Sequence, residues 1–302
     1  MTESAGKTLQ INSILYLNER SRIEQTIEHL DRAVDHAIAN GCYSRAVLAY
    51  GDCSPKRVFD EASLDGIRAG LYAIERFDYR YFDRNLGSAL GHNTLLEQSE
   101  GDDVLIINPD IMLAPNAIVE LSKRLAEGRV GMAEAKQLPV EHPKHYDAVT
   151  GETSWAATAC TLIPGDTIRK LGGFDHESFF LYCDDVDFSW RVRLAGEKVA
   201  YVPSACAYHD KRLGAGGQWV AGAAERFYSA QAALFLSYKY SREDLTKRWL
   251  AEFEATGDEN YLKAAASFKE KEAAGTLPVQ LDPEGKVAMF VDGNYAPHRF
   301  TL

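Results

Sequence analysis

In the first 110 residues, short apolar runs alternate with longer stretches in which apolar residues recur every three or four positions. The pattern predicts, in order, a strand at 9–17, a helix at 21–41, a strand at 45–52, a helix at 63–77, a strand at 79–83, a helix at 89–101 and a strand at 102–110. Strands that alternate with helices are typical of a mostly parallel sheet with helices on its faces. We therefore expect a Rossmann-like half at 9–110.

Beyond residue 110 the pattern is less regular. It predicts a helix at 114–128, a strand at 129–137, a polar loop at 138–155, a strand at 155–164, a short helix at 165–173 and a strand at 197–209 that is broken at Pro203. From Gln218 to about residue 275 the chain is expected to be helical, and 279–291 is expected to form a hairpin. We therefore expect an α/β domain at 1–215, whose second half is 111–215, and a mainly helical C-terminal extension at 216–302.

The composition argues against several classes of function. The net charge of −11 disfavours nucleic acid as a partner and disfavours a polybasic membrane anchor. No apolar run approaches the roughly 18 residues that span a bilayer, and the N-terminus lacks the apolar core of a signal peptide. The five cysteines are widely spaced without a CxxC pair, as in a reduced protein that has no zinc site. We expect a soluble, cytoplasmic protein.

Polar residues follow the predicted strands, at the edge of the sheet where α/β proteins bind ligands. Asp52 follows the second strand, and Asn108 and Asp110 follow the fourth. The segment 84–93 between them contains Asn85, Gly87 and Asn93. Each aspartate could equally be a turn residue or a helix cap, but together these residues describe the edge of one pocket.

No glycine-rich phosphate motif follows the first strand, so a bound diphosphate would need a metal ion and side chains. Magnesium and manganese prefer oxygen ligands and take one or two protein carboxylates together with substrate phosphates. Asp110 is the candidate ligand.

Three carboxylates lie within four positions of the segment FFLYCDDVDFSWRVRLAG (179–196). A helix that starts near residue 186 would use Asp184 or Asp185 as its N-cap and would place Asp187 in its first turn. Asp187 would also pair with Arg191 at the i,i+4 spacing. This interpretation explains one or two of the acids but not all three.

Five segments in order resemble the family 2 glycosyltransferases of GT-A fold, in particular the bacterial rhamnosyltransferase-like branch. They are NLGSALGHN, LIINPDI, SWAATACTLIP, LGGFDHESFFLYCDDVDFSWRVRLAG and VAYVPSACAYH, and the resemblance covers about 9–212. It implies a GT-A fold with a Rossmann-like mixed central sheet, in which 9–110 binds a nucleotide sugar and 111–215 binds the acceptor.

The resemblance also implies the binding residues. Asp110 and His209 would bind Mn²⁺ or Mg²⁺ beside the diphosphate of the donor. Asp52, Asn85 and Gly87 match family residues that would hold the nucleotide-sugar donor. Asn93, Asn108, Lys211 and Arg212 are further candidates for donor binding because of their positions in the sequence. Lys211 and Arg212 precede a glycine-rich stretch that would close over the donor, or that would simply link to the helices.

Asp185 would be the general base, with Asp184 as the neighbour that tunes it. Trp155 and Asp187 would lie on the acceptor side. The sequence departs from the branch at Thr158–Ala159, where Gly-Ala is common, and in the YLNE that ends the first strand, where TYN is common.

The implied activity is metal-assisted, inverting transfer of a sugar from a dTDP-rhamnose-like or UDP-hexose donor to a glycan, a lipid-linked acceptor or another hydroxyl. Such an enzyme would be cytoplasmic, at the inner face of the membrane where its acceptor is a lipid. The aromatic residues of the helix predicted within 220–241 indicate packing in the core or in a homodimer. Two alternatives remain open: a haloacid-dehalogenase-type phosphatase, whose acidic motif LYCDDVDFS imitates, and a non-catalytic nucleotide- or glycan-binding scaffold.

Overall fold

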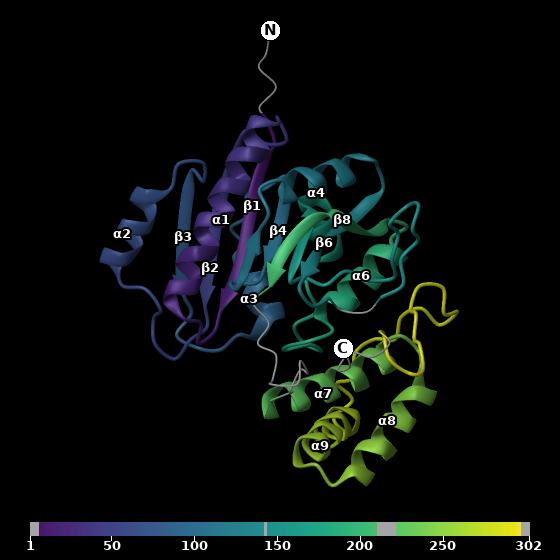
Figure 1. The fold of residues 1–302 in the computed structure, drawn as a ribbon. Coiled ribbons are helices and arrows are strands. Elements are labelled where there is room, and N and C mark those ends of the chain that lie inside the picture. The colour runs from purple at the N-terminus through teal and green to yellow at the C-terminus, as the bar shows by residue number, and fades with distance from the viewer. Residues whose placement is uncertain (1–5, 142–143, 210–221, 297–302) are drawn as a thin grey trace.

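The computed structural model describes residues 6–141, 144–209 and 222–296, which form one large sheet and a bundle of helices below it (Figure 1). The sheet has eight strands in the order β3-β2-β1-β4-β7-β6-β8-β5. The strands are β1 (Thr8–Leu15), β2 (Arg45–Asp52), β3 (Arg76–Tyr81), β4 (Asp103–Ile107), β5 (Ile111–Leu113), β6 (Val130–Leu138), β7 (Cys160–Pro164) and β8 (Lys198–His209).

The sheet is mixed, as the resemblance implies. Strands β3, β2, β1 and β4 are parallel, which confirms the predicted Rossmann-like half. Strand β7 runs antiparallel to both β4 and β6, and β5 runs antiparallel to β8. The parallel strands end on one edge, so the segments that follow them meet there.

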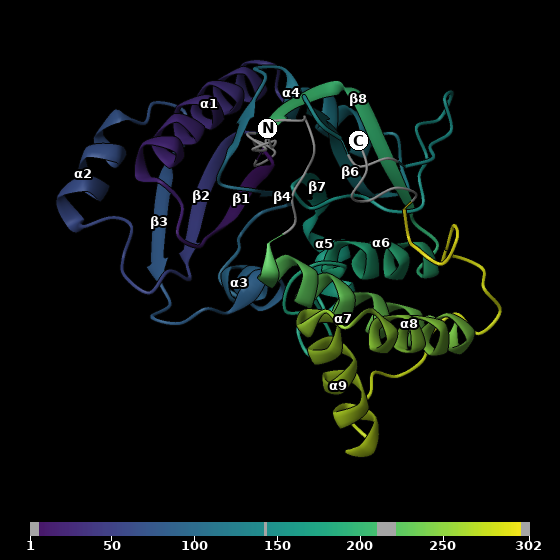
Figure 2. The ribbon, with the colours of Figure 1, turned by 60° about the horizontal axis from the view of Figure 1, so that its bottom comes forward.

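Helices cover both faces of the sheet (Figure 2). Helices α1 and α4 lie on one face, and α3, α5 and α6 lie on the other, with α2 near the β3 edge. Their bounds are α1 (Arg20–Ala39), α2 (Glu61–Gly70), α3 (Gly87–Leu96), α4 (Ala117–Ala126), α5 (Gly165–Leu171) and α6 (Asp184–Leu194). A separate apolar cluster fills the space on each face.

Two sequence predictions are wrong in detail. The helix predicted at 63–77 ends at Gly70, because the buried Asp31 carboxylate accepts hydrogen bonds from the backbone N–H groups of the segment 72–74 and holds it extended. The hairpin predicted at 279–291 does not form. Instead, the Asp282 carboxylate accepts hydrogen bonds from the N–H groups of 286–288, which leaves none of them for a strand ladder.

The break predicted at Pro203 is a bulge within one strand. Strand β8 continues from Lys198 to His209, but its pairing with β6 jumps from Val202 to Cys206 between adjacent β6 residues. Proline has no N–H to donate, so the chain loops out at this point and then rejoins the ladder.

The C-terminal helices form a bundle against α6, below the sheet (Figure 2). They are α7 (Ala223–Lys239), α8 (Glu243–Thr256) and α9 (Glu259–Ala273), which confirms the predicted helical extension. Trp190 of α6 packs edge-on against Tyr240 and Phe290, with ring centroids 4.7 and 5.1 Å apart. In α7, Phe235 is buried in the same apolar cluster, and the partly buried Phe227 and Tyr238 pack against it. A homodimer through these helices stays a prediction. The predicted domain boundary at residue 215 lies outside the described residues.

A buried charge network ties α6 to α7. The Asp187 carboxylate is fully buried and pairs with Arg191 Nε at 2.8 Å, as the i,i+4 spacing predicts, and with Lys239 Nζ at 2.6 Å. Tyr240 donates its hydroxyl to the same carboxylate at 3.1 Å. Lys239 also pairs with Asp175 at 2.7 Å, so the loop before α6 joins the network.

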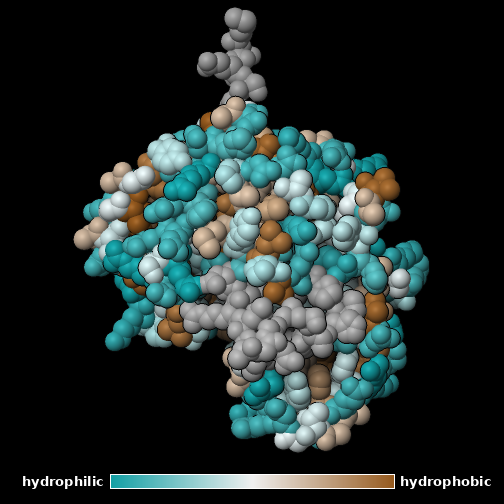
Figure 3. Space-filling view, viewed as in Figure 1, coloured by the Kyte–Doolittle hydropathy of each residue, from teal (hydrophilic) through white to brown (hydrophobic). Residues whose placement is uncertain are grey.

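The described surface is largely hydrophilic, with apolar side chains scattered over it (Figure 3). Among the described residues, no helix combines the length and apolar character that a membrane span requires.

Replacing Asp187 by alanine is expected to lower the free energy of unfolding by about 3–5 kcal/mol, because Lys239 and Arg191 would remain buried without their shared counter-charge. Chemical denaturation measures the change. The matched control is Glu252→Ala, which removes an exposed i,i+4 pair with Arg248 and should cost less than about 0.5 kcal/mol. Equal effects of the two substitutions would contradict a structural role for the network.

Candidate active site

The segment after β4 lies at the carboxyl edge of the sheet and is held from two sides. Asn108 donates its backbone N–H to the carbonyl of Ala159 at 2.8 Å. The Thr26 hydroxyl of α1 donates to the carbonyl of Pro109 at 3.0 Å. These bonds position Asp110 immediately before β5.

Asp110 and His209 lie side by side, as the resemblance implies. Strand β5 pairs with β8 so that Ile111 is opposite His209, and His209 Nε2 lies 3.4 Å from Asp110 Oδ1. On the other side of the ring, His209 Nδ1 is 2.8 Å from Gln137 Oε1 of β6. An amide oxygen only accepts, so Nδ1 carries the proton and the Nε2 lone pair faces Asp110.

This pair fits a divalent metal site. An imidazole nitrogen whose tautomer is fixed by a second residue, beside a carboxylate, is a common arrangement in metal sites. Within the described residues no cluster of three or more His, Cys, Asp or Glu side chains could hold an ion. Two protein ligands suffice where substrate phosphates supply the others, as is usual for Mg²⁺. Gln137 was not predicted as a site residue, because no sequence pattern in β6 distinguishes it from an ordinary polar residue of a strand.

Asp52 organises the loop that follows β2. Its fully buried carboxylate accepts hydrogen bonds from the N–H groups of Ser54 at 2.8 Å and Val58 at 2.9 Å, and from the Tyr79 hydroxyl. These partners occupy both oxygens. A direct contact between Asp52 and a nucleoside stays a prediction, and the observed role of Asp52 is to shape the loop.

The loop before α3 is in close contact with the segment before α6. Asn85 Oδ1 accepts a hydrogen bond from the N–H of Gly87 at 3.0 Å, and the N–H of Ser88 donates to the carbonyl of Phe180 at 3.0 Å. Gly87 has a φ of +71°, and a Cβ placed there would lie 2.2 Å from the carbonyl oxygen of Phe180. Only glycine allows this approach of the two backbones.

Asn93 lies further along α3 and has a structural role in the described residues. Its side-chain amide makes paired hydrogen bonds of 2.8 Å with the N–H and carbonyl of Phe174. The predicted donor contact of Asn93 therefore gains no support from the geometry. Lys211 and Arg212 lie outside the described residues, as does the predicted glycine-rich closure.

Helix α6 begins at Asp184 instead of near residue 186, and the residue before it is Cys183. Asp184 and Asp185 are therefore not N-caps: all three acids of the motif lie in the first turn, where the helix dipole favours negative charge. Tyr182 and Cys183 have φ values of +67° and +58°. Two successive left-handed residues are strained for side chains other than glycine, and such strain collects at functional sites.

Asp184 and Asp185 lie in different environments. Asp184 is buried, and its Oδ2 has no hydrogen-bond partner among the described residues. Burial and, secondly, the nearby charge of Asp185 raise the pKa of Asp184 to about 7, although a hydrogen bond with Ser88 opposes the shift. Asp185 is half-buried, and its Oδ1 accepts the N–H of Val186 at 2.8 Å. The more accessible Asp185 is thus better placed to meet a substrate.

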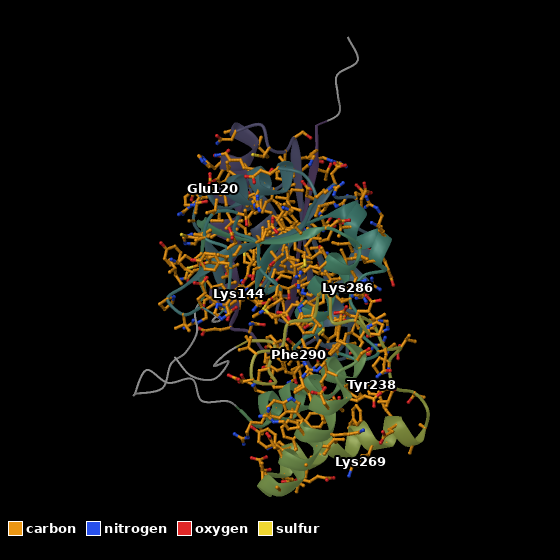
Figure 4. The ribbon with its side chains drawn as sticks, turned by 90° about the vertical axis from the view of Figure 1, so that its right-hand side faces the viewer. Glu120, Lys144, Tyr238, Lys269, Lys286 and Phe290 are labelled. Atoms are coloured by element: carbon orange, nitrogen blue, oxygen red, sulfur yellow. The ribbon has the colours of Figure 1, made fainter. Side chains whose placement is uncertain are left out.

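The buried side chain of Lys144 lies against Glu134 and Trp155. Lys144 contacts the Glu134 carboxylate of β6, and its Nζ lies 3.3 Å from the carbonyl of Trp155 and 3.9 Å from the centre of its ring. Burial raises the pKa of Glu134, and Lys144 opposes the shift. The charge of Asp185 adds to the rise, so Glu134 and Asp185 interact electrostatically. Figure 4 labels Lys144 in the part of the chain above the helices.

Hydrogen bonds continue from this lysine to α6. The N–H of Ala156 donates to the Ser189 hydroxyl at 3.0 Å, and that hydroxyl donates to the carbonyl of Asp185 at 2.7 Å. Neither Lys144 nor Glu134 was found from the sequence, because they come from a loop and a strand that only the fold brings together.

The two residues predicted on the acceptor side are interior. Trp155 is 2% exposed and packs edge-on against Tyr295, with centroids 5.1 Å apart. Asp187 is fully buried in the charge network described above. The geometry gives no support to an acceptor contact by Asp187, and one by Trp155 stays a prediction.

Aromatic side chains border the same edge. Phe180 stacks on Tyr228 of α7 with centroids 4.8 Å apart, and Tyr16 after β1 is 48% exposed. Tyr16 begins the YLNE segment, in which the sequence departs from the rhamnosyltransferase-like branch, and no role was predicted for its side chain.

No protein-family model matches the chain. In sequence it is similar to rhamnosyltransferase WbbL of Escherichia coli, with 25% identity over 186 residues, which are 50% of this chain and 67% of that protein. It is also similar to the N-acetylglucosaminyl-diphospho-decaprenol L-rhamnosyltransferase of Mycobacterium tuberculosis, with 40% identity over 57 residues, which are 19% of this chain and 18% of that protein.

Solved structures share the fold. GalNAc-T7 with UDP, GalNAc and Mn²⁺ aligns with a TM-score of 0.64 and 12% identity, over 91% of this chain and 56% of that one. The mannosyltransferase PcManGT of Pyrobaculum calidifontis, in complex with GDP-Man and Mn²⁺, aligns with a TM-score of 0.55 and 16% identity, over 91% of this chain and 81% of that one. The matches confirm the GT-A fold and the resemblance to rhamnosyltransferases. The motif that imitates a phosphatase lies on helix α6 and not after a first strand, so that alternative has no structural support.

Replacing Asp184 by asparagine is expected to stabilise the protein in a pH-dependent way. The pKa of Asp184 rises from 3.8 to about 7 on folding. Between these two pH values Asp184 is protonated in the folded state and ionised in the unfolded chain. The stability of the wild type therefore falls as pH rises from about 4 to 7, by about 1.4 kcal/mol per pH unit, and then levels off. The advantage of Asp184→Asn should grow across the same window in denaturation experiments. Asp166→Asn, 95% exposed on α5, is the control, and a pH-independent advantage of Asp184→Asn would contradict the raised pKa.

Proposed function

We propose that this glycosyltransferase of the family 2 type transfers a sugar from a nucleoside-diphosphate donor to a hydroxyl group, with inversion at the anomeric carbon. The observation that carries the proposal is the pair of Asp110 and His209, whose imidazole is held by Gln137 of β6. Glu134, on the same strand, interacts electrostatically with Asp185 of α6. Strand β6 thus contributes one residue that acts on each part of the proposed site.

Asp110 Oδ1 and His209 Nε2 would hold a divalent ion, Mn²⁺ or Mg²⁺, between the protein and the donor diphosphate. When bound, the ion supplies positive charge that stabilises the departing nucleoside diphosphate. Gln137 keeps the Nε2 lone pair of His209 directed at Asp110 throughout.

Asp185 is proposed to accept the proton of the acceptor hydroxyl. The hydroxyl oxygen then forms a bond to the anomeric carbon from the side opposite the diphosphate, whose bond to that carbon breaks, and this single displacement inverts the centre. Asp184 lies next to Asp185 in the first turn, and the charge of Asp185 raises the pKa of Asp184, so the two acids are electrostatically linked.

For the donor we propose a nucleoside-diphosphate deoxyhexose of the rhamnose kind. The support is the similarity to two rhamnosyltransferases, while the solved neighbours hold UDP or GDP-Man. Tyr16 at the carboxyl edge offers an exposed ring on which a nucleobase could stack.

For the acceptor we propose a hydroxyl on a lipid-linked glycan, at the inner face of the membrane. The name of the mycobacterial relative, with its diphospho-decaprenol acceptor, supports this choice.

Asp185→Asn is expected to lower kcat for sugar transfer by about 100-fold or more, because the amide cannot take up a proton, while donor binding persists. Transfer is measured with nucleotide sugars, Mn²⁺ and a lipid-linked acceptor. Asp65→Asn, exposed on α2, should be unaffected. Unchanged transfer by Asp185→Asn would refute the base, and the absence of both transfer and nucleotide binding in the wild type would favour a scaffold.

Gln137→Leu is expected to weaken Mn²⁺ binding by about 10- to 100-fold, because the His209 ring would lose the partner that fixes its tautomer. Titration of Mn²⁺ in the presence of nucleoside diphosphate measures this without catalysis. The control Gln10→Leu changes a buried glutamine near the start of β1, and an equal loss in both variants would count against the proposed role.

A further inference from the structure

A largely apolar cavity of about 450 Å³ lies inside the C-terminal helical unit. Helices α7, α8 and α9 and the segment 290–296 enclose it, with Phe290 labelled near it in Figure 4. Its apolar wall consists mainly of Ala233, Leu236, Trp249, Phe253, Tyr261 and Phe290. The volume is in the range of pockets that bind small organic ligands, about 300–1,000 Å³.

The cavity has a polar end on helix α7. The residues of α7 that line it run from Arg226 to Leu236, which corresponds to about 15 Å along a helix. Arg226 and Ser229 lie at the N-terminal end of this run, and alanine and leucine side chains continue it. Ser229 is 7% exposed, and its hydroxyl has no hydrogen-bond partner among the described residues. The cavity thus suits an elongated molecule with an apolar body and one polar end.

The turns of α7 that carry the polar end also contact the segment before α6. Tyr228, next to Ser229 in the chain, stacks on Phe180, whose carbonyl accepts the N–H of Ser88. Ser88 in turn contacts Asp184. Contacts therefore connect the N-terminal part of α7, where the cavity has its polar end, to the first turn of α6.

We propose that the cavity binds the isoprenoid chain of a lipid-linked acceptor, with the phosphate end of the lipid near Arg226 and Ser229. The inference rests on the proposed function and extends it to the residues that recognise the lipid. The positive charge of Arg226 suits a phosphate, although Asp258, 3.5 Å away, shares that charge. The aromatic wall supplies the apolar contact surface for the first isoprene units.

The test is binding of farnesyl phosphate, measured by calorimetry with the full chain. Ala233→Phe fills the cavity and should weaken binding by about tenfold or more, because the added ring takes up volume that the isoprenoid chain would occupy. Ala224→Phe, an exposed position on the same helix, is the matched control and should bind like the wild type. Should Ala233→Phe fail to fold, Ser229→Leu narrows the same cavity at its polar end.

Equal binding by the wild type and the cavity variants would overturn the proposal. Decyl phosphate bound as tightly as farnesyl phosphate would overturn the isoprenoid assignment, because the cavity would then accept a linear alkyl chain equally well. Ala233→Phe should also raise the KM for the lipid-linked acceptor without changing the KM for the donor. Because farnesyl phosphate binding needs no catalysis, failure of the proposed glycosyl transfer and failure of this inference give different results.

Discussion

The buried carboxylate of Asp187 fixes the position of helix α6, which carries the proposed base. A buried carboxylate is stable only where its charge is compensated, so Arg191 and Lys239 must both stay in contact with it. Arg191 belongs to α6 itself and Lys239 to α7, and together they fix α6 against the C-terminal helices. The first turn that carries Asp184 and Asp185 is held between the sheet and the helical unit as a consequence.

Strand β6 connects the two halves of the site. Gln137 contacts His209 near the end of the strand, and Glu134, three residues earlier, interacts electrostatically with Asp185. A rigid strand holds such groups more accurately than a loop does, which suits a reaction in which a leaving group and an attacking hydroxyl must lie on opposite sides of one carbon. The buried Lys144 lowers the cost of placing Glu134 there.

The fold could be predicted from the sequence to a large extent, and two of the errors have identifiable physical causes. Order and type of the elements followed from hydrophobic periodicity, which is a property of neighbouring residues. The second helix was predicted too long because Asp31, far away in sequence, binds the backbone at 72–74. The hairpin at 279–291 was wrong because Asp282 takes the N–H groups that a strand would need.

By itself, the sequence determined the alternation of strands and helices, the placement of Asp52 and Asp110 after strands and the spacing of Asp187 and Arg191, because these depend on positions close together in the chain. Only the tertiary structure decided which acid is buried and which is accessible, and that Gln137 meets His209 across 72 positions. Burial and long-range hydrogen bonds depend on which surfaces pack together, and local sequence patterns carry no information about that packing.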